Sequence, residues 1–256
     1  MKAALALVAS LALLEVVPLV ATTAHAASQM NFSIPPPIPE TLHSGLSLWA
    51  TYYYVHSANE LKPGISFNDK NGKALTGSVS PREWCLGAIE GTIQVRSQAS
   101  NKTVNYAGSR VQSKVDCASI LRIDRTQKPW IQAVGKSFFS AARGLYGDGV
   151  AGYVLVPFRT IAVDPTRTPI GSVVYVPDAK GTVIGYDSVL PIKHDGYLFA
   201  ADKGDAIKGS HIDVFCGSSC TNCFPSVVYT NATQTIQAFI VNDSNAITVL
   251  KGLHNR

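Results

Sequence analysis

The second half of the chain consists of short apolar segments separated by turn-forming residues, and this pattern restricts the folds open to it. A series of such segments runs from Gly149 to Leu250. They are Val154–Pro157, Ile161–Val163, Val173–Val176, Val183–Tyr186, Tyr197–Ala201, Ile212–Phe215, Val227–Tyr229, Ile236–Val241 and Ala246–Leu250. Strands of this length and spacing are typical of closed β-barrels and β-sandwiches. The sequence therefore predicts a mainly β fold for this region.

The middle of the chain, residues 64–148, shows a mixed pattern. Ser80-Pro81-Arg82-Glu83 combines a capping box with proline at the first helical position, which predicts a helix from Pro81 to about Ile89. Apolar spacing predicts a second helix over Trp130–Arg143, whereas Thr92–Arg96 is β-prone. We therefore expect a smaller α+β lobe inserted into the β fold.

The N-terminal residues carry the pattern of an export signal. Lys2 precedes an apolar run from Ala3 to Val20, and Ala24-His25-Ala26 offers the small residues that signal peptidase recognises. Glu15 and Pro18 leave too little uninterrupted apolar length for the roughly 20 residues of a membrane span. We therefore expect a signal peptide at residues 1–26, a periplasmic or secreted protein without lipid attachment, and no integral membrane association.

A proline-rich segment follows the expected signal. Residues 27–45 contain Ser33-Ile34-Pro35-Pro36-Pro37-Ile38-Pro39, where proline removes backbone donors, and this composition predicts an extended tether. Leu46–Val55 is rich in aromatic residues and predicts the first strand of the fold. The β domain is then expected to comprise residues 46–63 and 149–256, on either side of the lobe.

The five cysteines of an exported chain indicate disulfides. Cys85 and Cys117 lie in the middle of the chain, whereas Cys216, Cys220 and Cys223 cluster late, so we expect one disulfide within each group and one remaining thiol. A zinc site at the late cluster lacks a suitably spaced fourth ligand. We therefore expect neither a metal nor an organic cofactor.

The charge balance argues against nucleic acid as a partner. Lys and Arg number 22 against 17 Asp and Glu, and the basic residues form no cluster. Nucleic-acid-binding proteins normally concentrate basic side chains in a stripe or patch. A spread positive charge suits diffusion near an anionic surface such as a cell wall.

Three aspartates follow apolar, strand-like segments, which places each carboxylate at a strand end or in a loop. Asp164 stands in Ala-Val-Asp-Pro, Asp202 in Ala-Ala-Asp-Lys-Gly and Asp213 in His-Ile-Asp-Val-Phe. Turn and cap chemistry explains such aspartates in most chains, and Asp164 before Pro165 fits it best. The joint occurrence of all three segments in this order is far more specific than any one of them.

These segments, together with Thr51 and Tyr53 in Ala-Thr-Tyr-Tyr, resemble the 3D domain. That family is named for three aspartates and occurs in cell-wall proteins, including lytic transglycosylases related to membrane-bound lytic transglycosylase A. The resemblance implies a six-stranded double-psi β-barrel, with the inserted lobe as the opposite wall of a substrate groove. It also implies peptidoglycan glycan strands as the partner, and we expect a monomer.

The resemblance further implies a role for each matching residue. Asp213 matches the catalytic acid/base, and Asp202 and Asp164 match the two aspartates that shape and support the site. The residues expected to contact substrate are Thr51, Tyr53, Lys208 and Gly209. Seven aromatic side chains are candidates for stacking on sugar faces, although an alternating strand buries every second one: Trp49, Tyr52, Tyr53, Tyr54, Trp84, Trp130 and Tyr197. Among them we expect Tyr53 to reach the groove and most of the others to lie in cores.

One carboxyl group is sufficient for the reaction that a lytic transglycosylase performs. The β-1,4 bond between N-acetylmuramic acid and N-acetylglucosamine is cleaved without water, because the muramoyl O6 hydroxyl attacks C1 and forms a 1,6-anhydro ring. The acid that protonates the leaving oxygen then accepts the O6 proton, unlike the carboxylate pair of hydrolases. Such an acid needs a raised pKa, for which Ile212, Val214 and Phe215 supply apolar surroundings.

A second class of function fits the same fold. Where the family has Asp-Thr-Gly-Gly, this chain has Asp202-Lys203-Gly204-Asp205, which adds two charges beside the site. This change and the short inserted lobe together support the alternative of a non-catalytic, expansin-like protein that binds or loosens wall polysaccharide. His194 and His211 flank the site in sequence, and we expect both to be neutral or hydrogen-bonded. Lys193-His194-Asp195-Gly196 predicts a turn in which Asp195 is not catalytic.

Overall fold

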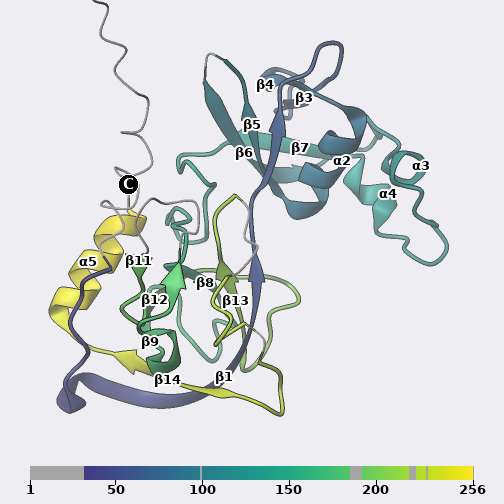
Figure 1. Cartoon of the computed structure of the whole chain (residues 1–256). Coiled ribbons are helices and arrows are strands. Elements are labelled where there is room, and N and C mark those ends of the chain that lie inside the picture. Colours follow the sequence, from purple (N-terminus) through teal and green to yellow (C-terminus); the bar gives the residue numbers. More distant parts are fainter. Residues whose placement is uncertain (1–31, 99, 185–191, 219–222, 229, 256) are drawn as a thin grey trace, which may run out of the picture.

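The computed structural model describes residues 32–255 except residues 99, 185–191, 219–222 and 229 (Figure 1). The expected signal peptide, the first part of the expected tether and Cys220 lie outside the described residues. Within them the chain forms a closed six-stranded barrel and a second lobe built around a four-stranded sheet. No helix in this part of the chain is long and apolar enough to cross a bilayer.

Strands that are distant in sequence close the barrel. In spatial order they are β1 (Leu42–Tyr53), β13 (His211–Phe215), β8 (Thr160–Ala162), β12 (Tyr197–Asp202), β9 (Val173–Tyr175) and β14 (Ile236–Val241). The pairs β1–β13 and β12–β8 are parallel, and the other pairings are antiparallel. The six pairings are related by a pseudo-two-fold symmetry. If β1 is exchanged with β12, β13 with β8 and β14 with β9, each parallel pair becomes a parallel pair and each antiparallel pair becomes an antiparallel pair. This two-fold arrangement is that of a double-psi barrel, and the predicted fold class is confirmed.

Side chains alternate between the inside and the outside of the barrel along each strand. On β13, Ile212 and Val214 are 1% and 0% exposed and belong to the apolar cluster that fills the barrel. Their neighbours His211 and Asp213 point outward and are partly exposed. On β1, Leu48 and Ala50 point inward. The outward residues of these two neighbouring strands therefore share one outer surface.

A helix covers another part of the barrel exterior where the sequence predicts a strand. Ala246–Leu250 lies within α5 (Ser244–His254), which begins at Asp243, whose side chain accepts a hydrogen bond from the Ala246 N–H. Ala246, Leu250 and Leu253 recur at helical spacing and pack with the outer residues of β9 and β12. The strand prediction is wrong here because the helical period and the cap outweigh the β-branched residues.

Most of the other strand predictions are confirmed, but two are not. Val154–Pro157 contributes only an isolated bridge between Val154 and Asp148, and Val227 and Val228 lie in a turn. A short hairpin of β10 (Val183–Ile184) and β11 (Ile192–Lys193) lies outside the barrel sheet. Single turns of 3-10 helix lie at η1 (Pro39–Thr41) and η2 (Pro177–Ala179).

The second lobe is a mixed α+β unit, as predicted. Its sheet has the order β2 (His56–Asn59), β5 (Thr92–Arg96), β6 (Asn101–Ser109) and β7 (Ser137–Ala141), beside a hairpin of β3 (Ile65–Asn68) and β4 (Ala74–Val79). The predicted first helix is α2 (Pro81–Glu90). It begins at Ser80, whose hydroxyl accepts the Glu83 N–H, and ends at Gly91, whose φ of 80° suits glycine.

The predicted helix over Trp130–Arg143 is wrong. Only α4 (Ile131–Val134) is helical there, after α3 (Cys117–Leu121), and β7 follows at once. Ser137 and Phe139 are buried while Phe138 between them is partly exposed, which is the period of a strand. The period of two along β7, which pairs with β6 at the edge of the lobe sheet, therefore prevails over the helical spacing of the larger apolar residues.

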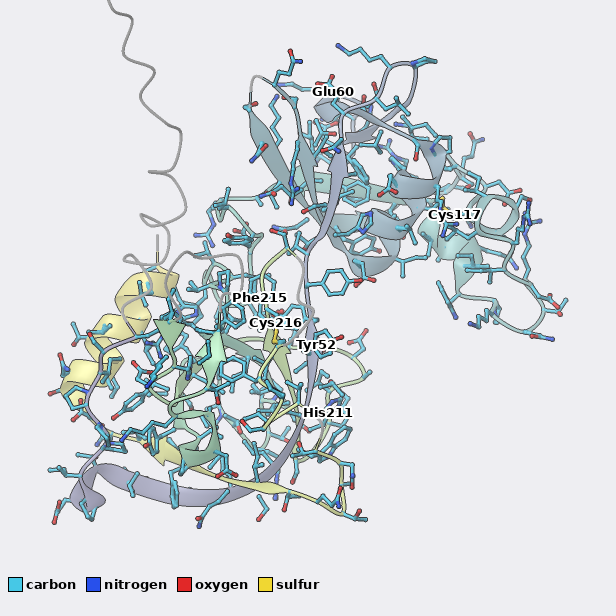
Figure 2. The ribbon with its side chains drawn as sticks, viewed as in Figure 1. Tyr52, Glu60, Cys117, His211, Phe215 and Cys216 are labelled. Atoms are coloured by element: carbon cyan, nitrogen blue, oxygen red, sulfur yellow. A yellow bond between two sulfur atoms is a disulfide. The ribbon has the colours of Figure 1, made fainter. Side chains whose placement is uncertain are left out.

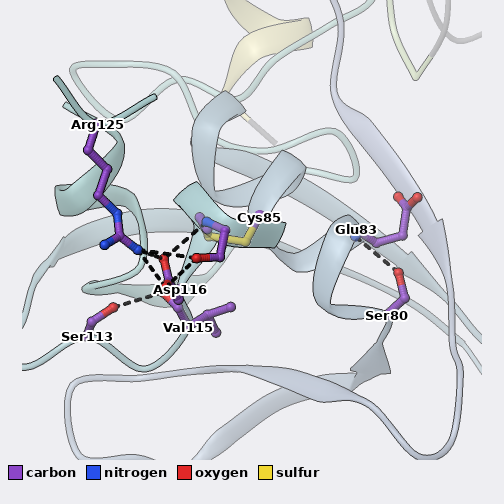
Figure 3. Close-up of a disulfide and its surroundings, with 9 residues drawn as sticks. Ser80, Glu83, Cys85, Ser113, Val115, Asp116 and Arg125 are labelled. Atoms are coloured by element: carbon purple, nitrogen blue, oxygen red, sulfur yellow. Dashed lines mark hydrogen bonds and ion pairs between the residues drawn. A yellow bond between two sulfur atoms is a disulfide. The ribbon is translucent and has the colours of Figure 1, made fainter. Parts of the chain in front are cut away.

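Two disulfides confirm the predicted pairing within each cysteine group. Cys85 joins Cys117 and ties α2 to α3 in the lobe (Figure 3). Cys216, directly after β13, joins Cys223. These bonds occupy two of the late cysteines and remove them as thiolate ligands.

The boundaries between the parts differ from those expected. β1 begins at Leu42, inside the expected tether, and β2 pairs with β5 of the lobe although residues 46–63 were expected in the barrel. Only Tyr54 and Val55 separate β1 from β2, so one extended segment serves both parts (Figure 1). Local sequence does not mark the point at which such a segment changes partners.

A buried ion pair fastens the N-terminal segment to the barrel. Arg159, 0% exposed, donates from Nη1 and Nη2 to Oδ1 and Oδ2 of Asp195 at 2.6 and 2.7 Å. The same carboxylate accepts the N–H groups of Tyr197 and Ile34. Burial lowers the pKa of the adjacent His194 to about 3, so this histidine is neutral, as expected. Asp195 thus has a structural role.

We predict that Asp195→Ala lowers the free energy of unfolding by about 3–5 kcal/mol, because it removes the carboxylate that neutralises the buried charge of Arg159. Urea denaturation followed by circular dichroism measures this change. Arg125→Ala, which removes an exposed ion pair with Asp116, serves as the control and should leave the midpoint nearly unchanged. Equal midpoints for Asp195→Ala and the control would contradict the prediction.

Candidate active site

Three cross-strand pairs line the outer surface shared by β1 and β13. The parallel register places Trp49 opposite His211, Thr51 opposite Asp213 and Tyr53 opposite Phe215. In parallel strands, directly opposed residues lie on the same face of the sheet. The barrel itself therefore brings two sequence motifs that are distant along the chain, near residues 51 and 213, into contact.

Asp213 lies at the centre of this surface. The Thr51 hydroxyl donates to Asp213 Oδ1 at 2.9 Å, and the side chain is partly exposed rather than used as a turn cap. Burial raises the pKa of Asp213, and the Thr51 hydrogen bond and the nearby His211 only partly oppose this rise. Asp213 therefore retains its proton to higher pH than an ordinary aspartate does.

Asp202 lies close by, at the end of β12. Both Asp202 and Asp213 pair with Ala162, so β8 lies between the two aspartates. The Tyr53 hydroxyl donates to Asp202 Oδ2 at 2.8 Å and the Lys203 N–H donates to Oδ1 at 2.9 Å. Burial raises the pKa of Asp202, and the charge of Asp213 adds to this rise while the two donors oppose it. The two carboxyl groups are thus electrostatically coupled.

Tyr53 connects this pair of carboxyl groups to the lobe. Its ring lies 5.1 Å from that of Phe215, in an apolar cluster of Val55, Leu155 and Phe215 that Tyr146 also joins. Burial and the two aspartates raise the pKa of Tyr53, so its hydroxyl stays a hydrogen-bond donor. The carboxyl groups therefore lie beside the junction of barrel and lobe.

Asp164 has a different environment from the other two aspartates. Its Oδ2 accepts the Gly209 N–H at 2.8 Å, and its Oδ1 accepts the N–H and hydroxyl of Thr166 at 2.9 and 2.8 Å. These hydrogen bonds lower the pKa of Asp164 to about 2. The exposed Lys208 acts on Asp164 in the same direction. Asp164, Lys208 and Gly209 thus form a loop-fastening group beside the pair of Asp202 and Asp213.

Two further residues of this surface, His211 and Trp49, were considered from the sequence but not expected to form part of the site. The His211 ring stacks on Trp49 with centroids 3.7 Å apart and planes 3° apart, and its Nε2 lies 2.8 Å from Thr51 Oγ1. Trp49, one of the aromatic candidates for sugar stacking of which most were expected to be buried, is partly exposed on the outer face. The two-residue spacing of His211 and Asp213 on one strand was the available signal, because it places both side chains on one face.

Glu90, at the end of α2, brings a lobe carboxyl group within electrostatic reach of Asp213. Burial raises the pKa of Glu90, His56 opposes the rise and Asp213 adds to it. Nothing in the sequence marks Glu90, because its proximity depends on how the lobe is placed. Among the described residues, no cluster of three or more His, Cys, Asp or Glu side chains has the arrangement of a metal site.

Comparison with known proteins identifies the region that carries these aspartates. Residues 159–223 match the family model of the 3D domain, and this match includes Asp164, Asp202 and Asp213 but begins well after Thr51 and Tyr53. No curated protein sequence matches the chain significantly.

Several solved structures of lytic transglycosylases are similar to the chain. MltA of Escherichia coli with bound chitohexaose is 12% identical, with a TM-score of 0.46, and the match covers 77% of this chain and 72% of that one. A membrane-bound lytic murein transglycosylase of Agrobacterium tumefaciens is 16% identical, with a TM-score of 0.44 and coverages of 78% and 75%. LtgG of Burkholderia pseudomallei is 19% identical, with a TM-score of 0.37 and coverages of 76% and 72%.

We predict that Tyr53→Phe raises the pKa of Asp202, because the lost hydroxyl donor stabilises the ionised carboxylate. Carboxyl ¹³C NMR titration of the labelled protein measures the change. Tyr52→Phe is the matched control, since Tyr52 is 41% exposed on the same strand. An unchanged Asp202 titration in Tyr53→Phe would show that this hydrogen bond does not hold the carboxylate.

Proposed function

The chain contains a 3D domain at residues 159–223, and from that premise we propose that it is an exported lytic transglycosylase of peptidoglycan. It would cleave the MurNAc-GlcNAc β-1,4 bond and leave a 1,6-anhydro product, with Asp213 as the single acid/base. The observation that carries this proposal is the environment of Asp213. A partly exposed carboxyl group with a raised pKa lies beside a second carboxyl group in the domain that the family match identifies.

The hydrogen-bond donors around the two carboxyl groups favour the proton on Asp213. Among the described residues, Asp202 accepts from both the Tyr53 hydroxyl and the Lys203 N–H, whereas Asp213 accepts from Thr51 alone. Donors stabilise the ionised form, and two coupled carboxyl groups retain one proton to higher pH than either would alone. The donors thus favour an ionised Asp202, positioned by Tyr53, whereas the burial of Asp202 and the charge of Asp213 act in the opposite direction. We assign the acid to Asp213 on this difference in donors and on its place beside Thr51.

The reaction then needs one proton carrier. Asp213 gives its proton to the glycosidic oxygen as the bond from that oxygen to C1 breaks, which releases the GlcNAc hydroxyl. The muramoyl O6 attacks C1, and its proton passes to the Asp213 carboxylate, so the acid is restored. Thr51 donates to the carboxylate form in between and keeps it oriented. Asp164 and the loop of Lys208 and Gly209 would support this site from beside it.

The proposed setting follows from the expected export signal and the substrate. We propose a monomer in the periplasm or outside the cell that acts on glycan strands without a cofactor. The spread of basic residues over the chain suits an anionic wall polymer.

A non-catalytic wall-binding protein is the second candidate, and one observation favours it. Lys203 and Asp205 are exposed beside Asp202, where they add charges absent from the family pattern. Such a protein would bind glycan strands on the same surface without cleaving them. The experiment below separates the two candidates.

We predict that Asp213→Asn lowers the yield of anhydro product at least ~100-fold, because general acid catalysis contributes about that much or more. Purified protein is incubated with peptidoglycan sacculi and 1,6-anhydromuropeptides are quantified by mass spectrometry. Asp164→Asn is the control, since its carboxylate faces backbone donors, and it should retain far more activity. No anhydro product from the unmodified protein, with sacculus binding retained, would favour the non-catalytic candidate.

We predict that kcat/KM falls as the pH rises through the raised pKa of Asp213, because the acid must be protonated. Thr51→Val removes a hydrogen bond that lowers this pKa, so the falling limb should move to higher pH. The pH profiles of the two proteins on a soluble glycan strand measure the shift. A limb that moves to lower pH would contradict the assignment of the proton to Asp213.

A further inference from the structure

The stacked pair of Trp49 and His211 has no function in the chemistry proposed above, yet it is built into the same surface. The two rings lie parallel with centroids 3.7 Å apart, two residues along each strand from Thr51 and Asp213 and on the same face. The contact between His211 Nε2 and Thr51 Oγ1 ties the stack to the carboxyl group. When the Thr51 hydroxyl donates its hydrogen to an ionised Asp213, the Thr51 oxygen accepts a hydrogen bond from a His211 Nε2 that carries a hydrogen.

The position of this pair follows from the direction of the strands. On one side of Asp213 the surface ends at Phe215, which packs with Val55 and Leu155 at the junction with the lobe. On the other side it continues to His211, farther from the lobe (Figure 2). A linear polymer bound at Asp213 that extends away from the lobe therefore passes over the stacked rings.

The indole of Trp49 is available to a ligand. Trp49 is partly exposed, and it is absent from the apolar clusters that fill the described parts of the barrel and lobe. Its ring N–H makes no hydrogen bond to a described residue and is not among the buried unpaired groups, which include the N–H of Trp84. An aromatic ring with one polar edge is the common partner for the flat, C–H-bearing face of a sugar.

We propose that Trp49 and His211 form a hexopyranose-binding subsite next to Asp213. The indole carries the sugar face, and its N–H is free to donate to a ring substituent. His211 holds the indole in place and, through Thr51, fixes its position relative to the carboxyl group. The inference rests on the proposed function in one respect only, the class of sugar, which that function makes a β-1,4-linked strand of N-acetylhexosamines.

Binding of chitohexaose to the full chain carrying Asp213→Asn tests the subsite, because that variant separates binding from turnover. Isothermal titration calorimetry gives the affinity, and circular dichroism confirms that each variant is folded. Trp49→Ala in this background should weaken binding by roughly three- to tenfold, and Trp49→Phe, which keeps a smaller flat ring, should lose less. Trp130→Ala is the matched control, since Trp130 is 48% exposed on the lobe, and it should bind as its parent does.

Equal affinities for Trp49→Ala, Trp49→Phe and their parent would overturn the subsite, as would a parent that does not bind chitohexaose. If Trp49→Ala does not fold, the affinity of Trp49→Phe is compared with that of the parent: weaker binding supports the subsite and equal binding overturns it. The failure of the proposed function is a different result: no anhydro product from the chain with Asp213 intact. Loss of binding in Trp49→Ala together with that result would retain the subsite and reject the enzyme.

Discussion

The parallel pairing of β1 with β13 is the constraint on which the rest of the molecule depends. It closes the barrel, and because side chains alternate, it decides which residues of both strands lie outside. Ile212 and Val214 can fill the barrel only if Asp213 between them faces outward. The same pairing places Thr51 against Asp213 at hydrogen-bond distance. The core and the candidate site are thus two faces of one strand pair.

Asp202 and Asp213 show how one fold creates two different carboxyl groups. Both are partly buried and both have raised pKa values, but only Asp202 receives two donors. Asp164, saturated by backbone and hydroxyl donors, has its pKa lowered to about 2. The difference lies in burial and in the number and kind of donors that each carboxylate meets, so the three aspartates of the motif differ in how readily they ionise.

Local patterns in the sequence predicted what local interactions decide. Ser80 and Pro81 marked the start of α2, and the strand Ile236–Val241 was found with its observed bounds. Prediction failed where tertiary pairing chose between two periods, as at Phe138 and Phe139. The motifs located Asp202 and Asp213, but the stack of His211 on Trp49 could not be found, because it depends on the register of strands distant in sequence. The predicted boundary between barrel and lobe, which placed His56 in the barrel, was wrong for the same reason.

The separation between Thr51 and Asp213, 162 positions along the chain, also determines when the site can exist. Contacts this distant in sequence form late and slowly, because the chain between them must be closed into a loop first. β14, the barrel strand nearest the C-terminus, pairs with β1 and β9, so the ring is closed only after almost all of the chain is available. A chain still being synthesised therefore lacks the complete barrel that holds Asp202 and Asp213 together, and the candidate site forms only when almost the whole chain can fold.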